Sequence, residues 1–130
     1  MNQLIIVGNL GADPEMRYLE DGTPVTTFSV AVNRRWTDRE TSEAREKTWW
    51  FRVTAWRRQA EVCNEYLSKG KQVLVQGEVN ASAWLNEAGE ARASLELTAR
   101  SVRFLNENGG GNGAPPPMED EELLEQDIPF

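Results

Sequence analysis

The sequence contains no histidine and only one cysteine, Cys63, in 130 residues. The usual ligands of transition-metal sites are therefore missing, and so are histidine-based acid–base catalysis and the histidine-dependent nucleophile triads. Catalysis by carboxylates alone remains open in principle, but no pair of acidic residues stands out from ordinary surface charge. We therefore expect a protein that is not an enzyme, with no catalytic residue, no metal and no cofactor.

A single cysteine also excludes a disulfide within the chain. The N-terminus lacks the apolar core and the small-residue cleavage site of a signal peptide, and no stretch of the sequence resembles a transmembrane segment. These features predict a cytoplasmic protein that does not associate with membranes.

The last twelve residues contain no basic residue and six acidic ones. A packed core cannot use six carboxylates without a base, so such a segment is presented to another molecule. It follows Gly109–Ala114, which is flexible in composition, and Pro115–Pro117, a stiff polyproline spacer. We expect a Gly/Pro-rich linker over residues 106–118 and a disordered acidic tail over residues 119–130.

The tail ends in an apolar segment, Asp127-Ile128-Pro129-Phe130. One interpretation is a tail that only keeps the protein soluble, but such a tail gains nothing from a terminal isoleucine and phenylalanine. A phenylalanine side chain beside its own α-carboxylate suits an apolar pocket rimmed by Arg or Lys. We therefore expect Asp127, Ile128, Pro129 and Phe130 to bind a partner protein.

Negative charge is confined to the C-terminal part of the chain. The whole sequence has 14 basic and 21 acidic residues, a net charge of −7. Six acids lie in the tail and Glu107 lies in the linker, so residues 1–105 hold 14 acids and 14 bases. The acidic pI therefore does not exclude a polyanionic partner. Between Arg34 and Arg58, eight bases face four acids and form a local positive patch.

Strand signals dominate residues 1–105, a length that suits one domain with a single core. In the last predicted strand the apolar positions change parity near Arg100, which indicates a bulge where the sheet curls or closes. One helix is predicted over Arg58–Ser68, with Gly70 as its stop signal. Apolar runs and alternation predict five strands, within residues 4–7, 25–33, 50–56, 73–79 and 95–104.

Five strands with one helix between the third and the fourth is the layout of an all-β fold, the OB-fold. This fold is a small five-stranded Greek-key barrel. Other small barrels fit the same order of elements.

Five tryptophans are the most informative residues, and four of them lie in or beside the positive patch. Over residues 50–56, a period of two places Trp50, Arg52 and Trp56 on one face and three apolar residues on the other. The apolar residues make a core. The other face makes a poor core but a good platform, because the bases of single-stranded nucleic acid stack on such rings while nearby cations follow the phosphates.

Any one of these tryptophans could be buried, but five would consume most of the interior of so small a domain. Trp36 lies in the charged stretch 34–39, which predicts an exposed loop. Trp84 opens a hairpin whose turn is Asn86–Gly89. Trp49 points away from Trp50 and is expected to pack.

Four motifs point to one family: Ile6–Gly11 with Asp13-Pro14-Glu15, Thr48–Val53, Ala60–Gly70, and the last four residues. Together they make the chain resemble the bacterial single-stranded DNA-binding proteins from end to end. By position, the resemblance implies that Trp36, Trp50, Trp56 and Trp84 stack on bases and that Arg52, Arg58 and Lys69 line the DNA path. The full set of expected phosphate contacts is Arg34, Arg35, Arg52, Arg57, Arg58, Lys69 and Lys71.

The resemblance also implies a homotetramer that binds single-stranded DNA without sequence preference in replication, recombination and repair, associated with the nucleoid. Its tail would recruit the enzymes that act on that DNA. Two departures matter. Asn80–Ala83 replaces a basic residue found in relatives, which implies weaker phosphate contacts there. Phe51 occupies a position that is a histidine at a subunit interface in some relatives, which implies a more apolar contact.

Two other interpretations remain open. The first is an OB-fold module for RNA or a primosome component, resembling primosomal replication protein N, which would not need the C-terminal ending. The second is an adaptor protein whose tryptophans form a protein interface.

Overall fold

The computed structural model describes residues 1–105. The predicted linker over 106–118 and the predicted tail over 119–130, with Asp127–Phe130, lie outside the described residues. The chain forms six strands and one helix in the order β1 (Leu4–Leu10), β2 (Glu15–Tyr18), β3 (Pro24–Thr37), β4 (Ala44–Trp56), α1 (Arg57–Tyr66), β5 (Gln72–Leu85) and β6 (Ala91–Leu105).

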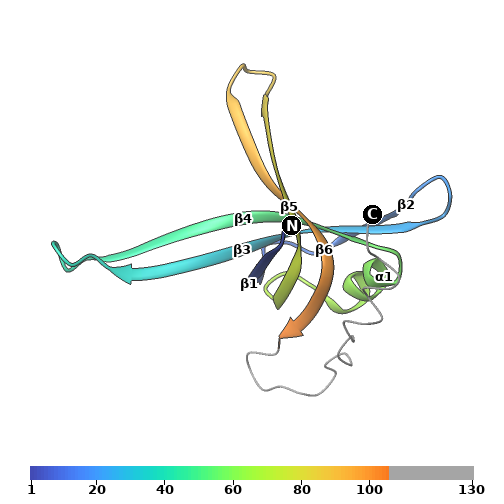
Figure 1. Cartoon of the computed structure of the whole chain (residues 1–130), viewed down its shortest axis with the longest axis horizontal. Coiled ribbons are helices and arrows are strands. Elements are labelled where there is room, and N and C mark those ends of the chain that lie inside the picture. Colours follow the sequence, from blue (N-terminus) through green and yellow to red (C-terminus); the bar gives the residue numbers. More distant parts are fainter. Residues whose placement is uncertain (106–130) are drawn as a thin grey trace.

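Five of the strands close into a barrel. Neighbouring strands follow the order β1-β5-β6-β4-β3, and β1 pairs with β3 through Asn9↔Ala31 and Leu10↔Val30 to complete the ring. The short strand β2 pairs only with β3 and adds an edge outside the ring. The helix lies between the third and fourth strands of the barrel. The predicted OB-fold is therefore confirmed (Figure 1).

Two hairpins project from the barrel as arms (Figure 1). The β3–β4 arm remains paired out to Thr37↔Ala44, whereas β6 pairs with β4 only over Phe51–Thr54. The β5–β6 arm remains paired out to Leu85↔Ala91. Beyond the barrel, each arm is thus a two-stranded ribbon, and no other strand within residues 1–105 pairs with it.

The prediction of a loop over residues 34–39 is wrong. Residues 34–37 continue β3, and Trp36 pairs with Arg45 within the ribbon. The connecting loop is limited to residues 38–43, where Asp38 N–H donates to the Glu43 carbonyl at 2.8 Å. The sequence did not predict this extension of β3, because a ribbon that is exposed on both faces needs no alternation of apolar and polar residues.

The core lies inside the barrel and beneath α1. Phe28, Val30 and Val53 from β3 and β4 are buried together with Val75 and Leu97 from β5 and β6. Phe51, which the resemblance places at a subunit interface, is only 8% exposed and packs in this core. Its ring therefore contributes chiefly to the packing of its own chain.

The helix packs as predicted, with Ala60, Cys63 and Leu67 buried against the barrel. Burial raises the pKa of the Cys63 thiol. The Thr26 hydroxyl, also buried, donates to the Ala60 carbonyl at 2.7 Å. The helix begins and ends slightly earlier than predicted, and Gly70, with a φ of 90°, lies in the left-handed conformation expected of a stop signal.

The predicted bulge near Arg100 is confirmed. The β5–β6 register steps from Gln76↔Ser101 to Gly77↔Ala99, so Arg100 is the extra residue of a bulge in β6. The Gln59 side-chain amide from α1 donates to the Arg100 carbonyl at 3.2 Å. The helix therefore satisfies the backbone group that the bulge releases from the sheet.

Candidate nucleic-acid interface

The outward face of β4 carries the predicted platform. Trp50 and Arg52 lie opposite Ala31 and Ser29 of β3, and these small partners leave the larger side chains uncovered. Trp50 is 55% exposed, and Trp56, three alternations further along β4, is partly exposed. The period of two over residues 50–56 therefore predicted this face correctly.

The pairing of β6 with its two neighbours extends this face to Trp84. Glu96 of β6 lies opposite Arg52 of β4 on one side and Asn80 of β5 on the other. Trp84 is two alternations from Asn80 on β5, and residues directly opposite in a ladder share a face. Trp84, which is 48% exposed, consequently lies on the same face of the sheet as Trp50 and Arg52.

Sequence reasoning missed two charged residues of this face. Arg92 lies directly opposite Trp84, and its guanidinium is 3.6 Å from the Glu90 carboxylate. Glu96 places a negative charge beside Arg52. The sequence could have placed Arg92 opposite Trp84 only through the turn at Asn86–Gly89, by pairing the residues on either side of that turn.

Trp36 lies on the other face of the β3–β4 arm. In the ladder, Arg34 pairs with Lys47 and Trp36 with Arg45. All four lie on the face of buried Phe51, which is opposite to the face of Trp50. Trp36 is 42% exposed, and the Arg34 guanidinium carbon lies 5.4 Å from the centroid of its ring. The structure thus groups three of the four predicted stacking tryptophans and sets Trp36 apart.

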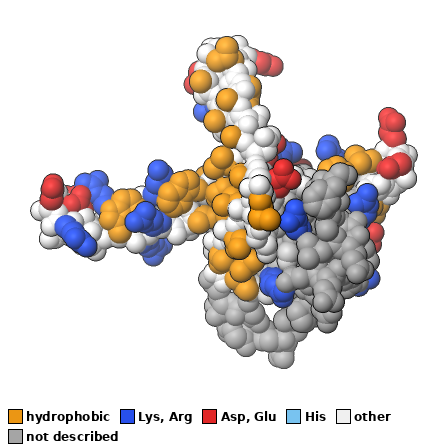
Figure 2. Space-filling view, in the orientation of Figure 1, with side chains coloured by type: hydrophobic (Ala, Val, Ile, Leu, Met, Phe, Trp, Pro, Cys, Tyr) orange, Lys and Arg blue, Asp and Glu red, His pale blue; other side chains and the backbone are white. Residues whose placement is uncertain are grey.

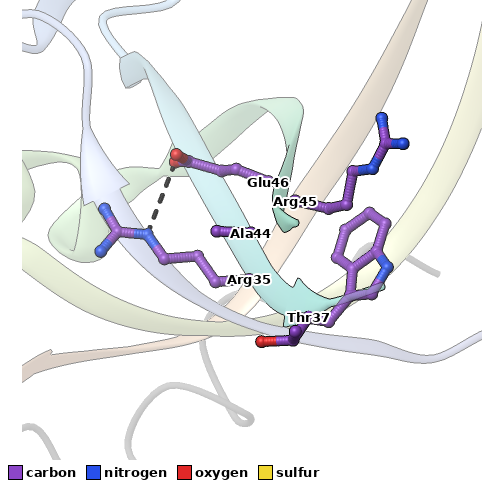
Figure 3. A pocket seen from close by; sticks show the side chains of 6 residues that line it. Arg35, Thr37, Ala44, Arg45 and Glu46 are labelled. Atoms are coloured by element: carbon purple, nitrogen blue, oxygen red, sulfur yellow. Dashed lines mark ion pairs between the residues drawn. The ribbon is translucent and has the colours of Figure 1, made fainter. Parts of the chain in front are cut away.

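The end of this arm forms an open hollow of about 450 Å³ beside Trp36. Arg45 pairs with Asp38 at 3.7 Å and with Glu43 at 3.5 Å. Arg35 pairs with Glu46 at 3.8 Å (Figure 3). Acidic residues therefore balance part of the positive charge at this end. Figure 2 shows Lys and Arg side chains interleaved with hydrophobic ones along the arm.

Trp49 packs against the edge of the core and is partly buried, as predicted. Lys47 Nζ lies 5.2 Å from the centroid of its ring, a cation–π contact. Trp49 thus belongs to the structure of the arm rather than to the exposed platform.

Lys69 and Lys71 lie in the loop between α1 and β5, next to the end of β1. Leu10 N–H donates to the Lys71 carbonyl at 2.9 Å, and Gly70 N–H donates to the Leu10 carbonyl at 2.9 Å. The Lys69 N–H donates to Asp13 Oδ1 at 2.8 Å. These bonds hold the two lysines beside the segment that connects β1 to β2.

Arg57 and Arg58 begin α1 directly after Trp56. Arg57 has a φ of 57°, a backbone conformation that is uncommon for residues other than glycine and asparagine. Hydrogen bonds from Thr23, with a smaller contribution from the charge of Arg57, hold the pKa of Asp21 below its usual range.

Arg52 lines a hollow of about 200 Å³ together with Asp13 and Glu15.

Neither a metal centre nor a membrane span is found in residues 1–105. No three His, Cys, Asp or Glu side chains in this part of the chain lie close enough to hold a metal ion. The described helix is not long and apolar enough to cross a membrane.

Comparisons with known proteins agree with this geometry. The model of the single-strand binding protein family matches residues 1–105. The chain is 38% identical over 112 residues to single-stranded DNA-binding protein 1 of Xylella fastidiosa, covering 86% of this chain and 82% of that protein.

Two solved structures share the fold with 30% sequence identity each. One is an SSB of Plasmodium falciparum in complex with ssDNA, with a TM-score of 0.69, and the other is a small single-stranded DNA-binding protein of Streptomyces coelicolor, with a TM-score of 0.70. Each alignment covers 82% of this chain and 96% of the solved one. Fold, sequence and exposed aromatic face agree, and the chain belongs to the single-strand binding protein family.

Proposed function

We propose that this protein binds single-stranded DNA without sequence preference. The observation that carries the proposal is one continuous sheet face on which Trp50, Trp56 and Trp84 are exposed around Arg52. The relatives support it, because one is named a single-stranded DNA-binding protein and another was solved with ssDNA.

The binding mechanism needs no catalytic group. Unstacked bases lie on the tryptophan rings, and each stacked base contributes about 1–3 kcal/mol. Arg52, Arg57 and Arg58 contact phosphates near this platform, with Lys69 and Lys71 beside β1 and with Arg34 and Arg35 on the arm. Ring faces and phosphates are common to all nucleotides, so this mode of binding reads little sequence.

Titration of the intrinsic tryptophan fluorescence with oligothymidine tests the proposal. We expect strong quenching that saturates, because bases stacked on the exposed indoles quench their emission. An adaptor protein whose tryptophans form a protein interface would show no response to the oligonucleotide. A clear preference for oligouridine over oligothymidine would instead favour the RNA or primosome alternative.

Salt dependence tests the phosphate contacts. We expect the logarithm of the binding constant to fall linearly with the logarithm of salt concentration, with a slope of about −0.7 for each phosphate contact on a single strand. Lys71→Ala should make the slope less steep by about one contact. Arg103→Ala, which removes a cation outside the predicted set, is the control. A binding constant that does not change with salt would show that the cations form only a solvated surface.

The larger assembly and the biological role are part of the same proposal. We infer a homotetramer, and the exposure of Ile5 (55%) and Val7 (42%) on β1 supports a subunit contact at that strand. Residues 1–105 form the DNA-binding domain, residues 106–118 a linker and residues 119–130 the partner-binding tail. The protein acts at the nucleoid in replication, recombination and repair, where Asp127–Phe130 recruits the enzymes that process the DNA.

A further inference from the structure

Gly11 lies directly against the exposed indole of Trp50. A Cβ atom added to Gly11 would be 2.5 Å from Cζ3 and 2.7 Å from Cη2 of the Trp50 ring. Both distances are far shorter than a carbon–carbon contact. One part of the indole therefore rests on the backbone of residue 11, while 55% of the Trp50 surface remains open to solvent.

The backbone around Gly11 is held on both sides. Gly11 N–H donates to the Ser29 carbonyl of β3 at 3.0 Å. The neighbouring Leu10 exchanges hydrogen bonds with Gly70 and Lys71, in the loop between α1 and β5. The backbone that meets the edge of the indole is thus fixed by the barrel and by the loop that carries the two lysines.

The need for glycine at this position comes from the indole and not from the fold. Gly11 has no positive φ, so its backbone conformation does not require glycine. At Gly8 and Gly77 an added Cβ would meet backbone oxygens, those of Ala31 at 2.2 Å and Thr98 at 2.0 Å, which cannot move away. At Gly11 the three nearest atoms all belong to the Trp50 side chain, which can rotate.

We propose that Gly11 is a positioning residue for Trp50. It meets the Cζ3–Cη2 edge of the indole and fixes the orientation of the ring against the sheet, so that the ring is already in place when a base stacks on its face. This inference rests on the proposed function of Trp50, and it gives the Ile6–Gly11 motif a role in binding beyond its place in the barrel.

The variant Gly11→Ala tests the proposal. The added methyl group should push the indole out of its place, so we expect affinity for oligothymidine to fall about five- to twentyfold, part of the contribution of one stacked base. In a Trp50→Phe background the smaller ring lacks the outer atoms that the methyl would meet. There we expect Gly11→Ala to change the affinity less than about twofold. Ala12→Ser, at the exposed neighbouring position, is the control and should bind like the wild type.

A second readout needs no nucleic acid. Labelling with fluorotryptophan gives one fluorine resonance for each of the five tryptophans, and Trp50→Phe identifies the line of Trp50. Gly11→Ala should shift that line and leave the lines of Trp36 and Trp84 in place. An unshifted Trp50 line would overturn the proposal.

The remaining outcomes also decide. An equal loss of affinity in both backgrounds, or no loss with Trp50 present, would show that Gly11 does not act through the indole. If Gly11→Ala folded only together with Trp50→Phe, the obstacle would be the indole, as proposed, whereas failure of both variants to fold would overturn it. If the wild type bound no oligothymidine, the proposed function would be wrong. The fluorine resonance of Trp50 would still show whether Gly11 contacts the indole.

Discussion

Trp50→Ala and Trp56→Ala should each weaken the binding of oligothymidine by about 1–3 kcal/mol for each stacked base that is lost. Both indoles lie on the outward face of β4, on either side of Arg52, where the sheet needs neither ring for its core. Removal of a ring therefore takes away stacking without opening a cavity. Affinity is measured by fluorescence titration or, because tryptophans are removed, by anisotropy of a labelled oligonucleotide.

Trp49→Phe is the matched control, since Trp49 lies beside Trp50 in the sequence but packs against the core. We expect this variant to bind within about twofold of the wild type, because an aromatic ring is retained at a position outside the platform. The platform would be refuted by unchanged affinity in both alanine variants, with circular dichroism showing an intact fold.

Deletion of Phe130 alone should abolish the binding of partner enzymes almost as completely as deletion of residues 119–130. The single deletion removes the aromatic ring and moves the terminal carboxylate to another residue, while all six acidic side chains of the tail remain. The measurement is recovery of replication and repair enzymes from cell extract on immobilised protein. Equal recovery by the Phe130 deletion and the wild type would mean that bulk negative charge is what the partners bind.

DNA affinity provides the control for the same deletions. Residues 119–130 carry six acidic side chains on the same chain as the positive patch, so we expect them to compete weakly with DNA. Deletion of residues 119–130 should accordingly preserve or slightly improve the affinity for oligothymidine. A large loss of affinity would place the tail within the DNA-binding surface.

Local patterns predicted the parts of the molecule that depend on burial. The alternation over residues 50–56 gave the correct faces of β4, and the change of parity near Arg100 located the bulge. The spacing of Ala60 and Cys63 gave the buried face of the helix. In each case one side of the element meets the core, and the apolar residues on that side form a pattern that can be recognised in the sequence.

The features that sequence reasoning missed depend on solvent exposure or on pairing between distant residues. Strand β2 is four residues long and mostly exposed, so it leaves no apolar pattern. The separation of Trp36 from Trp50 follows from the register of the long β3–β4 ribbon. The common face of Trp84 and Arg52 requires two ladders, one on each side of β6, which residue spacing along one strand cannot supply.

The order of the strands in the barrel constrains how the protein can fold while it is being synthesised. Strand β6 is the last strand within residues 1–105 to be synthesised, yet it lies between β5 and β4. Until its residues are available, β5 and β4 each present an unpaired edge in the barrel, and such edges attract other strands. A nascent chain that stops before Ala91 therefore cannot close the barrel. Completion of the domain must await residues near its own C-terminal end, which favours slow folding governed by contacts between distant segments.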